Sequence, residues 1–458
     1  MRTIPPQAAN SEVEEHMTER VDAGWSVREF HGLDLGDARL NRRLLIMAEA
    51  FGAQPAAPIN QASADWHHTK AAYAFFARER ALPAEILLPH QQRTLERMAA
   101  HAPLILAIQD TTFLNFTHHP ATSGLGPIGG GQRGLVMHST LAFTPQGLPL
   151  GLLDQQIWAR PEPAAKRTKQ RPIADKESHK WLSALRESVS MTPSEVRLVT
   201  IADREADIFA FLAEADELSA EYVIRAAQDR RLSGEAELLW AHMAQQAVVG
   251  TVTVEVAARG AKPARRADLL VRVAHITLQP PRREADDPGI WMEPLPVWAI
   301  WLHEERPPEG VESLDWLLLT NVAIATWLDA TERIGYSCVW PGTLSWHTIL
   351  KSGGSVEDGR LEAAERLKPY VALMGVVAGR LFWRTHLNRQ TPAAPCTTIL
   401  AEHEWKALST TIHRSPTIPA VAPSVRQAVR WIAQLGGFLG LLATVNPVLP
   451  LSGADGHG

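Results

Sequence analysis

The sequence predicts an α/β protein whose core is a mixed sheet flanked by helices, with a β-rich insertion and helical domains at both ends. Three observations support this prediction. Apolar runs of strand length, mixed with an amphipathic helix, occupy residues 103–226. The pattern is mostly β at about 228–320, and helical spacing dominates the two ends. We therefore expect a helical N-terminal domain (1–90), an α/β domain (91–385) that carries the insertion (228–320), and a helical C-terminal domain (386–458).

The composition is that of an ordinary globular protein, with 458 residues of which 45% are hydrophobic and 21% charged. The formal net charge of -5 gives no overall attraction to nucleic acid, so any DNA-binding surface must be a local patch. The two cysteines, Cys338 and Cys396, argue against a disulfide framework or a multi-cysteine zinc site. The N-terminus lacks an apolar signal segment, and the longest apolar stretch, Leu435–Val445, is too short to span a bilayer. We expect a soluble, cytoplasmic protein.

The N-terminal domain contains a candidate DNA-binding helix. Leucines and a methionine recur at roughly helical spacing between Leu40 and Met47, after a turn and cap at 34–37. Arg39, Arg42 and Arg43 lie on this helix. Three arginines on a short helix suit contact with phosphates, and the alternative is a solvated helix face.

Two of the predicted strands end in an aspartate. Leu104–Gln109 leads into Asp110, and Arg197–Ala202 leads into Asp203, which a helix at about 205–214 follows. The other predicted strands of the core are Leu135–Phe143, Leu148–Ile157 and Tyr222–Ala226. Those of the insertion are Thr251–Val256, Ala267–Ile276 and Val297–Leu302, and Trp316–Thr320 returns the chain to the core.

Neighbouring strand ends in one sheet can bring two carboxylates within a few ångströms, where their mutual repulsion favours binding of a divalent cation. Mg²⁺ prefers oxygen ligands, and a pair of such ions activates water and stabilises the leaving oxygen of a phosphodiester. Asp110 and Asp203 are therefore candidate catalytic residues and ligands of two Mg²⁺ or Mn²⁺ ions. The alternative is that they are capping or surface carboxylates.

Several ordered motifs resemble the IS-four-type insertion-sequence transposases, a three-carboxylate (DDE) family. The run Asp203-Arg204-Glu205-Ala206-Asp207 is similar to the signature around the family's second carboxylate, and Ile108-Gln109-Asp110-Thr111-Thr112 to the segment around its first. Further similarities are Leu35-Gly36-Asp37-Ala38-Arg39, Ala71-Ala72-Tyr73-Ala74-Phe75-Phe76, Lys176-Glu177-Ser178, Trp316-Leu317-Leu318-Leu319-Thr320, Leu350-Lys351-Ser352-Gly353 and Ala433-Gln434-Leu435-Gly436-Gly437-Phe438.

The resemblance implies a ribonuclease-H-like core with a β insertion. It also implies that Arg225 contacts DNA, with Arg230 extending that contact, and that Trp316 supports a flipped base near the transposon end. The alternative for Trp316 is a core tryptophan on a buried strand.

The third carboxylate of the family is missing from its expected place. Tyr336 and Lys351 match the tyrosine and lysine of the family's Tyr, Arg, Glu, Lys signature, which implies that both hold phosphates. Val339 stands where the arginine is expected, and the glutamate falls at Thr343 or Leu344, depending on the direction of counting. Pro341 and Gly342 are also poor residues for the interior of the expected helix.

The resemblance implies a bacterial, nucleoid-associated DNA transposase that cuts transposon inverted-repeat ends and joins them to target DNA as a homodimer. One alternative is an inactive remnant that still binds transposon ends. Another is a stand-alone nuclease of ribonuclease-H-like fold. After Phe438-Leu439-Gly440 the sequence departs from the basic, tryptophan-bearing helix of the family, at the expected dimer contact.

Overall fold

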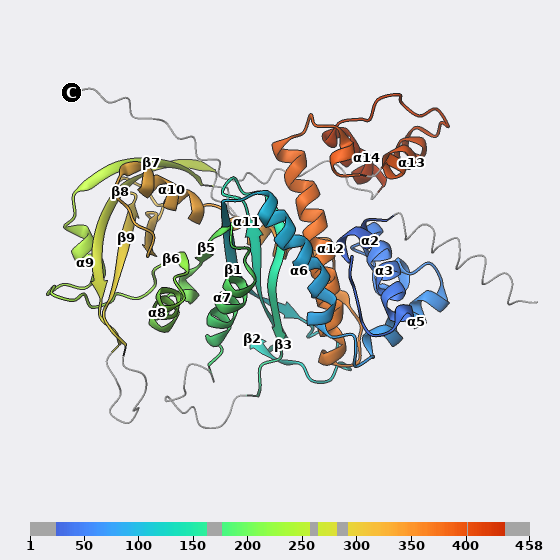
Figure 1. The fold of residues 1–458 in the computed structure, drawn as a ribbon, viewed down its shortest axis with the longest axis horizontal. Helices are drawn as coiled ribbons and strands as arrows, with labels where there is room; N and C mark the ends of the chain where they lie inside the picture. Colours follow the sequence, from blue (N-terminus) through green and yellow to red (C-terminus); the bar gives the residue numbers. More distant parts are fainter. Residues whose placement is uncertain (1–23, 163–175, 257–263, 282–291, 401, 436–458) are drawn as a thin grey trace, which may run out of the picture.

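The structure, a computed structural model, describes residues 24–162, 176–256, 264–281, 292–400 and 402–435. Figure 1 shows the N-terminal helices at one end of the molecule and the insertion at the other, with the α/β core between them. The predicted C-terminal stretch beyond residue 435 lies outside the described residues. Within the described parts of the chain, no helix is long and apolar enough to cross a membrane.

Helices alone form the described N-terminal part. Asp37 caps the arginine-bearing helix, because its side chain accepts a hydrogen bond from the Arg39 amide. The helices are α2 (Trp25–Glu29), α3 (Ala38–Ala53), α4 (Ile59–Ala62), α5 (Trp66–Phe76) and α6 (Pro83–Ala100). The predicted domain boundary at residue 90 falls inside α6, which packs on strand β4 and helix α12 of the core.

The core sheet has the strand order β4-β3-β1-β5-β6. Strand β1 pairs antiparallel with β3 and parallel with β5, and β5 pairs parallel with β6. This order and these directions are compatible with a ribonuclease-H-like core. The strands are β1 (Leu104–Asn115), β2 (Gly126–Gly129), β3 (Gln132–Phe143), β4 (Pro149–Trp158), β5 (Arg197–Ala202) and β6 (Glu221–Arg225).

The insertion continues the same sheet. Strand β10 (Asp315–Thr320) pairs antiparallel with β6 of the core on one side and with β9 of the insertion on the other. The sheet therefore runs without a break from the core through β9 (Leu295–His303) and β8 (Arg265–Leu278) to β7 (Val248–Val256). One short helix of this region, α9 (Leu239–Ala244), has no counterpart in the sequence prediction.

Helices cover both faces of the core sheet. Side chains of successive residues in a strand point to opposite faces. Gln109 lies beside His138, which packs on Trp181 of α7, so this face carries α7 (His179–Met191) and α8 (Phe209–Glu217). Asp110 points the other way, toward the face that carries α10 (Trp327–Ser337), α11 (Pro341–Thr348) and α12 (Ala364–Gln390). Helices α13 (Glu402–His413) and α14 (Val425–Leu435) lie beyond α12 (Figure 1).

Two predicted boundaries were wrong in detail, the end of strand β1 and the start of the expected catalytic helix. Strand β1 does not end at Asp110 but continues to Asn115, because β3 keeps pairing with it as far as Gly134. Pro341 does not interrupt a helix. Helix α10 ends at Ser337 and α11 begins at Pro341, the first helical position, where proline is well tolerated because its missing N–H would have no partner in the helix.

Candidate active site and DNA-binding surface

Asp110 and Asp203 lie side by side on one face of the sheet. Ile108 of β1 is opposite Ile201 of β5 in the parallel register. Asp110 lies two residues further along β1, and Asp203 directly follows the last residue of β5, Ala202. The charge of Asp110 acts on Asp203, so the two carboxylates are near neighbours, and Asp110 faces Thr343 of α11. The structure therefore brings together the two carboxylates that the sequence singled out.

The electrostatics of the pair are those of two crowded carboxylates. Burial raises the pKa of Asp203 to about 6, and the nearby charge of Asp110 adds to this rise. Asp203 also caps the 3-10 helix η2 (Arg204–Ala206) by accepting a hydrogen bond from the Glu205 amide, which opposes the rise. Asp110 is buried, with 5% of its surface exposed. Binding of a cation would relieve this repulsion.

Two side chains of α11 contact Asp110. The Thr343 hydroxyl lies 3.3 Å from Oδ2 of Asp110, and Nδ1 of His347 lies 3.3 Å from the same oxygen. Leu344 is 45% exposed and points away. Of the two positions at which the sequence placed the missing glutamate, Thr343 is thus the one that faces Asp110. Gly342 makes the approach of α11 possible, since a Cβ there would lie 3.0 Å from the Phe143 ring of β3.

Within the described residues, no three acidic, histidine or cysteine side chains are arranged to hold a metal ion. The oxygen donors that do converge are the carboxylates of Asp110 and Asp203 and the neutral hydroxyl of Thr343. Oxygen-only donors of this kind fit Mg²⁺, although with one carboxylate fewer than a three-carboxylate site.

An apolar pocket of about 290 Å³ opens beside Asp203. Arg225 and Trp316 line it together, with the Arg225 guanidinium 5.8 Å from the centre of the Trp316 ring. Burial lowers the pKa of Arg225, and its Nε has no hydrogen-bond partner in the described structure. Trp340, between α10 and α11, is a second aromatic wall that the sequence analysis did not identify.

Tyr336 and Lys351 lie away from this pocket. Tyr336 is buried in α10, with 2% of its surface exposed. The Lys351 ammonium donates a hydrogen bond to the Phe113 carbonyl, 2.6 Å away, at the end of β1 beyond Asp110. Glu357, a nearby acidic residue, accepts a hydrogen bond from the Asn115 amide, so it lies five residues past Asp110 along β1.

The Arg230 guanidinium forms an ion pair with a buried aspartate, Asp207. Its Nη2 lies 2.5 Å from Oδ1 of Asp207, which also accepts hydrogen bonds from the amides of Ala227 and Gln228, each 2.7 Å long. This arrangement accounts for the burial of Arg230 without any contact to DNA. Its neighbour Arg231 is exposed.

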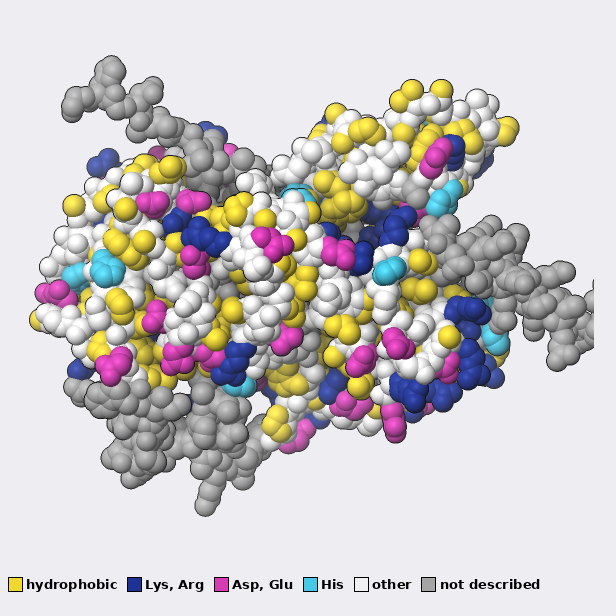
Figure 2. Space-filling model, viewed as in Figure 1, with side chains coloured by type: hydrophobic (Ala, Val, Ile, Leu, Met, Phe, Trp, Pro, Cys, Tyr) yellow, Lys and Arg dark blue, Asp and Glu magenta, His cyan; other side chains and the backbone are white. Residues whose placement is uncertain are grey.

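The N-terminal helices carry a cationic surface, which Figure 2 shows at the end of the molecule where α3 and α5 lie. A broad depression of about 750 Å³ between these helices is lined by four arginines, Arg39, Arg43, Arg78 and Arg80, and by two carboxylates, Asp37 and Glu79. The Arg39 side chain is 91% exposed and pairs with Asp37, and Arg42 is also exposed. This patch supplies the local positive charge that a chain of net charge -5 needs to bind DNA.

The sequence analysis did not identify two neighbours of the carboxylates. Lys180 of α7 is buried, lies 3.2 Å from Glu205 and lowers the pKa of Asp203. His347 of α11 contacts Asp110. No spacing rule links either residue to the aspartates, since the contacts arise from helices that pack onto the sheet from opposite faces.

Comparison with known families identifies the N-terminal part. Residues 22–81 match the family model described as transposase DNA-binding. The match covers helices α2 to α5, which carry the cationic surface. The match supports a DNA transposase and extends over these N-terminal helices alone.

One similar solved structure is a piggyBac transposase synaptic complex with hairpin DNA, at 8% sequence identity and a TM-score of 0.24. The alignment covers 63% of this chain and 55% of that chain, so it spans about half of the length of that transposase. A superposition this weak does not establish the fold.

Replacing Asp203 with Asn should stabilise the protein above about pH 6. The ordinary pKa of 3.8 rises to about 6 in the folded state, so above pH 6 the fold carries a charge that its surroundings disfavour. We expect Asp203→Asn to raise the free energy of unfolding by about 1–2 kcal/mol at pH 7.5, a value reduced for partial exposure. The gain should shrink as the pH falls through 6 and vanish near 4.

Urea unfolding from pH 4 to 8 measures this difference, with Asp216→Asn on the exposed end of α8 as the control. A gain for Asp203→Asn that does not change with pH would contradict the electrostatic cause.

Replacing Arg230 with Ala should destabilise the fold, because it leaves the Asp207 carboxylate buried without its counter-ion. We expect a loss of about 3–5 kcal/mol in the free energy of unfolding. Arg231→Ala is the matched control and should change stability by less than about 0.5 kcal/mol. Equal stability of the two variants, together with weaker DNA binding by Arg230→Ala alone, would assign Arg230 to DNA contact instead.

Proposed function

We propose that this chain is a DNA transposase that binds transposon ends through its N-terminal helices and acts on them at the Asp110–Asp203 site. The observation that carries the proposal is the parallel pairing of β1 with β5, together with the charge of Asp110 acting on Asp203 at the end of β5. The transposase DNA-binding match at residues 22–81 supports the substrate.

Each part of the chain has a separate role in this proposal. Arg39, Arg42 and Arg43 hold the phosphates of the transposon end by their charge. The pocket between Trp316 and Trp340 receives an extruded base, which needs an apolar or aromatic site, and Arg225 at its wall contacts the strand. This pocket adjoins Asp203, so an extruded base would place the neighbouring phosphate at the carboxylates.

Asp110 and Asp203 would hold Mg²⁺ or Mn²⁺, which supplies activation of water and stabilisation of the leaving 3′ oxygen. Lys180 and His347 keep the carboxylates in place until DNA and ion arrive, since each offers a compensating positive charge or hydrogen bond. Two ends are cut together only if two active sites meet, so the proposal includes a homodimer.

A second candidate function is an end-binding protein that does not cut. The specific observation in its favour is Thr343, a neutral residue where the family's third carboxylate would face Asp110. Strand-transfer assays with Mg²⁺ or Mn²⁺ separate the candidates. Joined products indicate a transposase, bound but uncut ends indicate the inactive protein, and cutting without joining indicates a nuclease.

The double variant Arg39→Ala/Arg42→Ala should weaken binding to duplex DNA from the flanks of the gene. The logarithm of the binding constant should fall less steeply with the logarithm of the salt concentration, by about 0.9 for each phosphate that the variant no longer neutralises. Fluorescence anisotropy at several salt concentrations measures this slope. Arg306→Ala, an exposed arginine in the insertion, is the matched control. An unchanged slope in the double variant would reject this helix as the DNA-binding surface.

Thr343→Glu should restore the third carboxylate. Without metal, a carboxylate beside Asp110 in this buried position should lower the free energy of unfolding by about 1–3 kcal/mol, and Mg²⁺ should reverse the loss. Cleavage of transposon ends should increase in the same variant. Thr343→Gln is the control, because glutamine is similar in size to glutamate but uncharged. It should show neither a response of stability to Mg²⁺ nor increased cleavage. Thr343→Glu without a response to Mg²⁺ and without cleavage would favour the non-cutting protein.

A further inference from the structure

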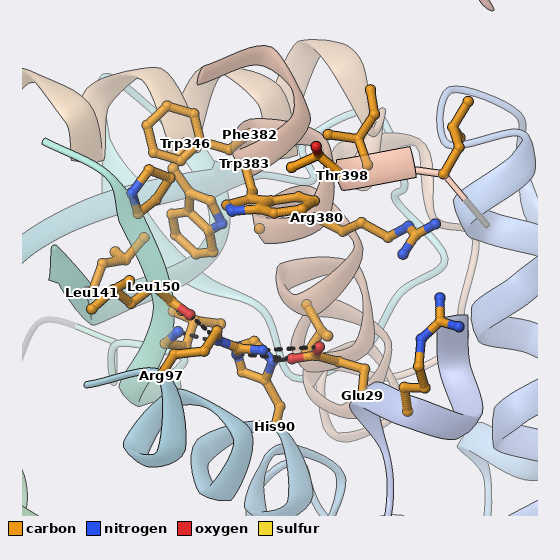
Figure 3. A pocket seen from close by; sticks show the side chains of 18 of the residues that line it. Glu29, His90, Arg97, Leu141, Leu150, Trp346, Arg380, Phe382, Trp383 and Thr398 are labelled. Atoms are coloured by element: carbon orange, nitrogen blue, oxygen red, sulfur yellow. Dashed lines mark hydrogen bonds and ion pairs between the residues drawn. The ribbon is translucent and has the colours of Figure 1, made fainter. Parts of the chain in front are cut away.

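A second cavity lies where three parts of the chain meet (Figure 3). Its walls come from α2 and α6 of the N-terminal region, β4 and α11 of the core, and α12 with the 3-10 helix η5 (Cys396–Thr398). We name it the junction pocket and define it by Arg28, Arg97, Trp346, Arg380, Phe382 and Trp383. Its volume of about 410 Å³ is in the range of small-molecule sites. It shares no residue with the pocket beside Asp203.

One wall of the junction pocket is aromatic. Figure 3 shows the rings of Trp346, Phe382 and Trp383 gathered on one side of the cavity. Trp346 is fully buried, yet its indole N–H has no acceptor in the described structure. Gly379 leaves room beside this N–H, since a Cβ there would lie 3.9 Å from Nε1. A buried donor without a partner is unfavourable, so a ligand that brings an acceptor would bind well here.

The opposite wall is polar, but its positive and negative side chains are already paired. Arg97 makes a bidentate ion pair with Glu29, with contacts of 3.0 and 3.2 Å. Nδ1 of His90 lies 2.5 Å from the same carboxylate, and its Nε2 accepts a hydrogen bond from the Leu152 amide. Although burial opposes it, these two partners hold the pKa of Glu29 well below its usual range. In this network the charges of Arg97 and Glu29 are therefore already paired with each other.

The end of the pocket between α2 and α12 has three arginines, Arg28, Arg380 and Arg384, near two carboxylates, Glu404 and Glu49. Arg28 is exposed and makes no hydrogen bond or ion pair in the described structure. Arg380 and Arg384 share Glu404, at 3.4 and 3.9 Å from the same oxygen. Burial lowers the pKa of Arg380 to about 9, and the charges of Arg384 and Arg28 contribute to this. Figure 2 shows Lys and Arg side chains in the hollow under the C-terminal helices, consistent with this site.

We propose that the junction pocket binds a nucleotide, with its base against Trp383, its edge toward the Trp346 N–H, and its phosphate at Arg28 and Arg380. Planar bases stack on aromatic side chains, and their ring nitrogens or carbonyls offer the acceptor that the Trp346 N–H lacks. Guanidinium groups bind phosphate oxygens by charge-assisted hydrogen bonds. The nucleotide comes either from a DNA strand or from the free pool, and the chemistry that recognises it is the same.

Calorimetric titration of the full chain tests the proposal with dAMP as the probe, and with deoxyadenosine and inorganic phosphate as its two halves. We expect dAMP to bind at least about tenfold more tightly than either half, since base and phosphate contact different walls. Arg28→Ala, a change of an exposed side chain, should weaken dAMP binding about tenfold, because it removes one guanidinium from the phosphate. Arg306→Ala should leave it unchanged.

Gly379→Leu fills the space beside Trp346 and should abolish binding of dAMP without lowering the thermal midpoint, because leucine favours the helix more than glycine. Displacement of dAMP by a single-stranded tetradeoxyadenylate would identify a DNA strand as the source, and failure to displace it would identify the free nucleotide. Binding that is equal for dAMP and phosphate, or unaffected in both Arg28→Ala and Gly379→Leu, would overturn the proposal. Asp203→Asn should bind dAMP normally, so the two sites can fail independently.

Discussion

The parallel pairing of β1 with β5 is the constraint on which the rest of the structure depends. Parallel strands need a long connection, and here β2, β3 and β4 of the same sheet, followed by α7 on the face opposite Asp110, lie between β1 and β5 in the chain. The pairing fixes the register, and a slip of one residue would turn either aspartate to the opposite face. Asp110 and Asp203 therefore lie together because the backbones of their strands do. Burial, with the added charge of Asp110, raises the pKa of Asp203 as a result.

The elements of the core could be predicted because their sequences are locally consistent. β5 was predicted at its observed bounds, and β3 and β10 to within a few residues, because each is an apolar run flanked by turn residues. The end of β1 was missed because the apolar run stops at the polar Gln109 and Asp110, although the residues from Thr111 to Leu114 favour a strand and pair with β3. The start of α11 was missed because a proline inside a helix and a proline at its first position look alike in sequence.

The site was predictable only in part, for a similar reason. The two aspartates follow strand patterns that are local in sequence, whereas their neighbours Thr343, His347 and Lys180 reach them through packing across 233 residues or from the opposite face. Arg230 shows the opposite case, in which a residue that the sequence assigns to DNA has a partner within the protein. A basic residue after a core strand resembles a phosphate contact in sequence, but the partner that it finds is Asp207, only 23 positions earlier.

Helix α11 has a consequence of its own. It is eight residues long and continues directly into a π-helical turn, Ile349–Gly353, so its position is set largely by what it touches. Of its consecutive residues, Trp346 lines the junction pocket and His347 contacts Asp110. Because Trp346 and His347 are adjacent in one helix, the packing that holds Trp346 at the junction pocket also holds His347 at Asp110. The position of one residue therefore restricts the position of the other.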